Sequence, residues 1–239
     1  MRALQVRLGA LIGAFLAGSL VVSVAAGPLE DGLSAYKSGD FAAALSLLRP
    51  LADQGDANAQ LQLGIMYRTG RGVPRDLVEA AKWLRKAADQ GLVGAQSSLA
   101  NMYEFGQGVA QDYGEAANWY RKAGDQGSAI AQYRLGDMYS RGRGVAQDDG
   151  EAAKWLNKAA DQGFAHAQFD LGIMYEKGRG VAQDYVQAHK WLDLAAARFP
   201  AGDPVLGPAA RSLRDSVAAK MTPAQMDDAK QLVREWRPK

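Results

Sequence analysis

The feature that most constrains this 239-residue chain is a pattern that recurs every 36 residues. A loop of the form Gly-x-Gly-Val begins at Gly70, Gly106, Gly142 and Gly178. Four further columns keep the same register without an insertion: Gln60, Gln96, Gln132 and Gln168; Met66, Met102, Met138 and Met174; Tyr67, Tyr103, Tyr139 and Tyr175; Trp83, Trp119, Trp155 and Trp191. A fixed period of this length indicates stacked units that each bury a face against the next. The chain is therefore expected to form a quasi-one-dimensional array.

Each copy of the pattern predicts two helices. In the first copy, Ala59, Leu63, Met66 and Tyr67 have the spacing of one amphipathic stripe. The glycines of the loop then end this helix, because they permit positive φ. An aspartate opens the second helix, with Glu or Gln three residues later, which is the pattern of a capping box. These pairs are Asp76/Glu79, Asp112/Glu115, Asp148/Glu151 and Asp184/Gln187.

The fold class that follows is all-α, an α/α solenoid with about 12 helices after the N-terminal segment, since no stretch alternates at period two. A small residue lies toward the flank of each first helix and is expected to let an adjacent helix backbone approach closely. The tryptophan of each second helix is expected to act as a wedge between units. The small residues are Gly64, Ala100, Gly136 and Gly172.

The pattern AxAQxxLGxMYxxGxGVxxDxxxAxKWxxKAAxQG resembles the Sel-one-like repeat, a subclass of the tetratricopeptide-like repeats, over Asp56 to about Ala197. The resemblance implies a curved, right-handed superhelix that mediates protein–protein contacts. Four copies are expected, together with a divergent leading repeat at 27–55 and two C-terminal capping helices within 200–239. The copies span 56–91, 92–127, 128–163 and 164–199.

Residues 1–26 have the pattern of a secretory signal peptide: a basic start, an apolar run and small residues that fit cleavage after Ala25 or Ala26. Export is therefore predicted, with an uncleaved membrane anchor as the alternative, and the resemblance to exported bacterial members of the family implies the periplasm or the medium. The whole chain has 28 basic and 26 acidic residues, and removal of Arg2 and Arg7 leaves 26 of each. A neutral chain is a poor candidate for nucleic-acid binding, which needs a basic excess.

Few residues could carry catalysis or bind a metal or cofactor, and none of the three is expected. The chain has no cysteine and two histidines, His166 and His189, which lack partners at metal-ligand spacing and are expected on the surface or in a groove. Ser34 and Lys37 match the Ser-x-x-Lys pattern of penicillin-recognising enzymes, but the partner tripeptides Ser-Asp-Asn and Lys-Thr-Gly are missing. An enzyme acting on cell wall or β-lactam therefore stays a second hypothesis.

Some positions vary between copies and lie on the side of each first helix that faces away from the buried stripe. These positions predict a partner-binding surface in the concave groove. We call this set the first-helix surface. It comprises Leu61, Gln62, Ile65, Arg68, Ser97, Asn101, Glu104, Tyr133, Arg134, Asp137, Phe169, Asp170 and Ile173. The leading hypothesis is a monomeric, non-catalytic scaffold or adaptor that binds a protein or peptide of the cell envelope, with regulation in the periplasm as its more specific form. A structural envelope component held by an uncleaved N-terminus is the third hypothesis.

Overall fold

The computed structural model describes residues 27–200 and 202–239, so the predicted signal peptide lies outside the described residues. All regular elements in the described part are α-helices, and there are twelve of them. They are α1 (Pro28–Ser38), α2 (Phe41–Asp53), α3 (Ala57–Thr69), α4 (Leu77–Asp89), α5 (Val93–Phe105), α6 (Tyr113–Asp125), α7 (Ala129–Arg141), α8 (Asp149–Asp161), α9 (Ala165–Lys177), α10 (Tyr185–Arg198), α11 (Leu206–Ala218) and α12 (Pro223–Glu235). The predicted all-α repeat fold is confirmed.

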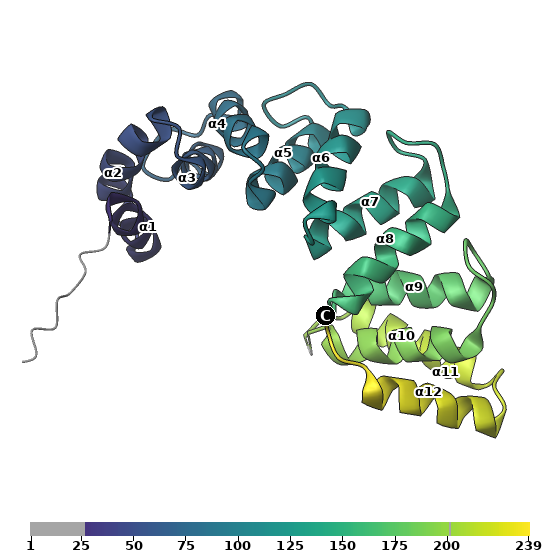
Figure 1. The fold of residues 1–239 in the computed structure, drawn as a ribbon. Helices are drawn as coiled ribbons and strands as arrows, with labels where there is room; N and C mark the ends of the chain where they lie inside the picture. The colour runs from purple at the N-terminus through teal and green to yellow at the C-terminus, as the bar shows by residue number, and fades with distance from the viewer. Residues whose placement is uncertain (1–26, 201) are drawn as a thin grey trace, which may run out of the picture.

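The helices follow one another along an arc (Figure 1). Packing is almost wholly between helices that are consecutive in the chain, as a solenoid requires. At the N-terminal end of the arc, α1 and α3 lie on its inner side, and α2 and α4 lie on its outer side (Figure 1). Within the described residues, no helix is long and apolar enough to cross a membrane.

The second helices begin at the predicted aspartates, but the reciprocal half of the capping box is missing. The Asp76 carboxylate accepts from the backbone N–H groups of Val78 and Glu79 at 2.9 Å. The backbone N–H of Asp76 already donates to the Tyr67 carbonyl at 2.9 Å, so Glu79 has no free donor to accept from. Glu79 instead pairs with Lys82 at 3.0 Å. The full capping box forms only at Thr222 and Gln225 of α12 among the described helices.

The second glycine of each Gly-x-Gly-Val loop lets two repeats approach at their backbones. Gly144 has φ +68°, and a Cβ there would overlap the carbonyl oxygen of Tyr113 at the start of α6. Gly108 and Gly180 have the same relation to Leu77 and Asp149. The loop therefore joins one repeat to the preceding one as well as turning the chain.

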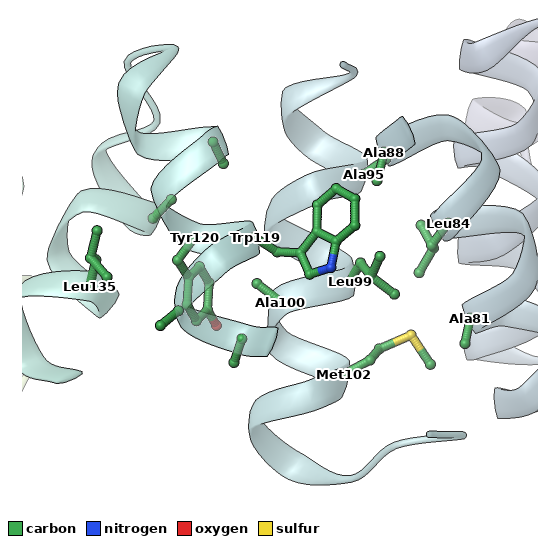
Figure 2. Packing of buried hydrophobic residues seen from close by; sticks show 14 of the residues in the cluster. Ala81, Leu84, Ala88, Ala95, Leu99, Ala100, Met102, Trp119, Tyr120 and Leu135 are labelled. Atoms are coloured by element: carbon green, nitrogen blue, oxygen red, sulfur yellow. The ribbon is translucent and has the colours of Figure 1, made fainter. Parts of the chain in front are cut away.

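The small residues on the first helices make room for a side chain as well as for the predicted close approach of a helix backbone. A Cβ at Gly136 would lie 2.8 Å from Cγ of Leu156 and 3.3 Å from the carbonyl oxygen of Ala152, both on the paired second helix. Ala100 takes this place in the second repeat, where the facing residue is Tyr120 rather than leucine. The tryptophans do wedge between units, since the Trp155 ring lies 3.1 Å from the Cβ position of Gly124 on α6. Figure 2 shows Trp119 and Tyr120 among the apolar residues of this core.

The repeated glutamines, for which the spacing predicts no role, form three separate hydrogen-bonded pairs: Gln60 with Gln90, Gln96 with Gln126, and Gln132 with Gln162. Gln132 is 4% exposed and donates from Nε2 to the Gly124 carbonyl at 2.8 Å. Gln162 in turn donates to Oε1 of Gln132 at 2.8 Å. Gln168 forms no such pair: its Oε1 has no hydrogen-bond partner in the described part of the chain, because Arg198 occupies the position of the next glutamine. These bonds satisfy buried amides and tie neighbouring repeats together.

The two predicted C-terminal helices cover the last repeat. Val217 of α11 is fully buried against Ala188 and Leu192 of α10, and Ala229 of α12 is fully buried too. The chain end then returns toward the third repeat, where the Lys239 backbone N–H donates to the Asp161 carbonyl at 3.0 Å. This unit closes the apolar end of the array, as terminal repeats of solenoids must.

Candidate functional site

Side chains of successive first helices contact one another along the array. Oγ of Ser97 lies 3.4 Å from Oγ of Ser128, which caps α7. The Tyr133 ring on α7 lies 5.8 Å from the ring of His166 on α9. These contacts join the first helices into one surface. Twelve of the thirteen residues of the first-helix surface are partly exposed: Leu61, Gln62, Ile65, Arg68, Ser97, Asn101, Tyr133, Arg134, Asp137, Phe169, Asp170 and Ile173.

Glu104 is the exception and does not fit the predicted surface. It is 6% exposed and accepts a 2.8 Å hydrogen bond from the Tyr120 hydroxyl, with Arg134 at 3.9 Å. Burial and the Glu104 carboxylate raise the pKa of Tyr120 above its usual value, so the hydroxyl remains a donor. The longer tyrosine in place of leucine reaches this carboxylate and draws it inward. Glu104 is thus part of the internal packing of the second repeat.

The surface has an apolar hollow in the third and fourth repeats, which we call the aromatic pocket. It measures about 280 Å³ and is lined by Ile130, Tyr133, Arg134, Phe164 and His166. Ile130 is 58% exposed, so it presents an apolar side chain to solvent beside these rings. The Tyr133 ring lies 5.1 Å from that of Phe164.

A second hollow, lined by charged side chains and by Leu156, Ile173 and Met174, is called the carboxylate pocket. It measures about 190 Å³, and Asp137 and Arg141 of α7, Asp170 of α9 and Arg179 of the following loop lie in its wall. Tyr133 joins the two hollows, because it precedes Asp137 by one helical turn and faces the same side of α7.

The ionic groups of the carboxylate pocket are unevenly paired. Arg141 forms an ion pair with Asp137. Arg179 donates to Asp149 at 3.0 Å and to Oγ of Ser140 at 2.7 Å. Asp170 has no ion-pair partner within 4.0 Å among the described residues. The carboxylate of Asp170 is therefore the one in this pocket whose charge no arginine of the described residues neutralises directly.

Burial is the main cause that raises the pKa of Asp170 to about 6, and the nearby Asp137 carboxylate adds to the effect. Arg141, Tyr133 and Arg179 oppose the rise without cancelling it. The same surroundings raise the pKa of Tyr133 to about 12, again chiefly through burial. A carboxylate that is costly to ionise in the free protein is a feature of binding and catalytic sites.

The two histidines differ in exposure, and His166 contacts Phe199, a residue that the repeat pattern did not single out. His166 is exposed as predicted, and its ring contacts the Phe199 ring edge-on at 5.2 Å. His189 is not on the surface: it is 7% exposed, and burial lowers its pKa. Alanine fills its column in the other copies, so that column marks a buried position, a signal present in the sequence.

The Ser34–Lys37 pair lacks the arrangement that its motif requires. Ser34 lies in the middle of α1 rather than at the start of a helix, and both side chains are exposed. The activating geometry of a serine at a helix N-terminus beside a desolvated lysine is therefore not present at this pair.

These features define the chain as an α/α solenoid of helix–turn–helix repeats with a continuous first-helix surface. The family model of the Sel1 repeat matches it four times, at residues 57–92, 93–128, 129–164 and 165–198. The chain belongs to the Sel1 repeat family. Proteins of this family generally mediate protein–protein interactions and generally act as non-catalytic scaffolds.

Two solved structures are similar over most of the chain. A Sel1 repeat protein from Oxalobacter formigenes is 29% identical with a TM-score of 0.70, and the match covers 83% of this chain and 88% of that one. The protein c5321, described as a protective antigen present in uropathogenic Escherichia coli strains and displaying an SLR fold, is 29% identical with a TM-score of 0.54. That match covers 87% of this chain and 52% of c5321.

The curated relatives match over a short segment. DAP3-binding cell death enhancer 1 of Rattus norvegicus is 43% identical over 49 residues, which is 20% of this chain. The protein of the same name from Mus musculus matches to the same extent. The chain spans 10% of the length of these relatives.

Proposed function

We propose that this protein is a non-catalytic scaffold that binds a protein or peptide partner through the first-helix surface. The observation that carries the proposal is the aromatic pocket, where the exposed Ile130 lies beside Tyr133 and Phe164 on adjacent repeats. Partly exposed aromatic groups beside charged groups are typical of protein-binding surfaces. The formal neutrality of the chain without its first 26 residues supports a protein partner over nucleic acid. A monomer is part of the same proposal.

The double variant Tyr133→Ala with Phe169→Ala tests the binding surface. We expect it to weaken capture of partners from a cell-envelope extract about tenfold or more, because aromatic side chains dominate such interfaces. The measurement is the amount retained on the immobilised protein across a dilution series of the extract.

The matched control is Val78→Ala, which removes part of an apolar side chain that is 54% exposed on α4, outside the first-helix surface. It should leave capture unchanged. Circular dichroism of all variants should show equal helicity. Equal capture by the double variant and the wild type, with helicity retained, would rule out this surface as the binding site.

We also propose that the protein is exported to the bacterial envelope, where it acts as a regulator or an assembly scaffold. The support is the sequence of residues 1–26, in which a basic start is followed by an apolar run and then by small residues. The expected mass of the exported protein corresponds to a start at Ala26 or Gly27. An intact mass that includes Met1 would favour the structural component anchored by its N-terminus, and a protein found only in the cytoplasm would contradict export.

A further inference from the structure

The two pockets of the third and fourth repeats differ in chemistry and are joined through one side chain. The aromatic pocket offers the exposed Ile130 and the rings of Phe164 and His166. The carboxylate pocket offers Asp170 on the other side of Tyr133. A partner that follows the first-helix surface would therefore meet an apolar site and the Asp170 carboxylate in succession.

The charged groups that line the carboxylate pocket are formally balanced, but they are not all paired with one another. Asp137 and Asp170 line it together with Arg141 and Arg179, whereas Asp149, which accepts from Arg179, lies outside the lining. Each arginine is already held by another carboxylate: Arg141 by Asp137, and Arg179 by Asp149 at 3.0 Å. Asp170 is left without an ion pair in the described part of the chain, in a mostly buried position.

A cation from outside would complete this arrangement. A lysine or arginine side chain that enters the pocket would pair with Asp170, and a charge-assisted hydrogen bond at a partly desolvated carboxylate is stronger than one in water. An anionic group would find Arg141 and Arg179 already held in ion pairs and would be repelled by Asp170. A neutral apolar group would leave the carboxylate buried and unpaired. Charge complementarity thus selects a basic group for this pocket.

Resting on the proposed function, we propose that the third and fourth repeats bind an extended peptide segment of a partner protein that carries a lysine or arginine close to a large apolar residue. The basic side chain pairs with Asp170, and the apolar side chain fills the aromatic pocket. Alternate residues of an extended peptide point to the same side, so one backbone can present both groups to neighbouring pockets.

The test uses the purified protein and a randomised peptide library displayed on phage. We expect the selected peptides to be enriched in Lys or Arg near an aromatic or large aliphatic residue. The same selection on Asp170→Asn should keep the apolar preference and lose the basic one. Helicity and melting temperature of the variant should show that the fold is retained.

A double-mutant cycle on one selected peptide then measures the pairing directly. Replacement of its basic residue by methionine should weaken binding to the wild type about tenfold, the effect of one hydrogen bond to a charged group. The same replacement should change binding to Asp170→Asn by less than about twofold. Fluorescence anisotropy of the labelled peptide gives both values.

Three outcomes would overturn the inference, and they are distinguishable. Peptides that depend on Tyr133 but show no basic preference would refute the role of Asp170 and leave the proposed function standing. Peptides that bind equally well to the Tyr133→Ala, Phe169→Ala variant, or no selected peptide at all, would contradict the proposed function too. Self-association detected by light scattering and abolished by Asp170→Asn would identify a second copy of this chain as the occupant.

Discussion

Replacing Gly144 by alanine is expected to lower the free energy of unfolding by about 4 kcal/mol, which combines left-handed backbone strain with overpacking. Gly144 has φ +68°, and the new Cβ would overlap the carbonyl oxygen of Tyr113. This atom belongs to the backbone at the start of α6, so no flexible side chain can move aside. Urea denaturation followed by helical circular dichroism measures the loss.

Gly127→Ala is the matched control, because Gly127 has φ +93° and nothing lies within 4 Å of a Cβ there. Its free energy of unfolding should fall by only about 1 kcal/mol, because backbone strain is the only cost. Similar losses for the two variants would show that the Gly-x-Gly-Val loop is a simple turn, and that its backbone contact with the preceding repeat does not hold the array together.

Replacing Asp170 by asparagine is expected to stabilise the protein by about 2 kcal/mol at about pH 7, because the neutral amide avoids ionisation in a mostly buried site. The pKa of Asp170 is raised to about 6 from its usual 3.8, so the folded chain holds this proton more tightly than the unfolded chain does. The contribution of Asp170 to stability is therefore largest below about pH 4 and falls as the pH rises to about 6.

Unfolding midpoints between about pH 4 and pH 7 test this sign, with Asp228→Asn, an exposed aspartate of α12, as the control. The difference between wild type and Asp170→Asn should grow with pH across this window, and the control should show no such growth. A variant that is less stable than the wild type at about pH 7 would show that Asp170 contributes a favourable ionic contact in the free protein.

The sequence predicted the solenoid well, because its periodic columns report local helix geometry and burial. The tryptophan and glycine columns repeat in every copy, and each keeps its environment from one repeat to the next. The prediction that Glu104 belongs to the exposed first-helix surface was wrong. Its burial depends on Tyr120, which stands where the other repeats have leucine and donates to its carboxylate. Residues at a position that varies between repeats contact neighbours that vary as well. The repeat pattern therefore does not show which of these side chains form pairs.

The candidate site was predictable only in part, for a related reason. Helix geometry predicted Tyr133, Asp137 and Asp170 as surface residues, since they lie on the side of the first helices that faces away from the buried stripe. Arg179 enters the carboxylate pocket from a loop, and Phe199 contacts His166 from the end of α10. These contacts depend on how adjacent repeats stack, which the spacing within one repeat does not specify.

Hydrogen exchange of the protein with and without a selected peptide reports where the partner binds. We expect slower amide exchange in α7 and α9 and in the loop that carries Arg179, with the second helices α6 and α8 unchanged. The Tyr133→Ala, Phe169→Ala variant should show no such protection. Protection confined to the second helices, or unaffected by that variant, would contradict a partner-binding role for the first-helix surface.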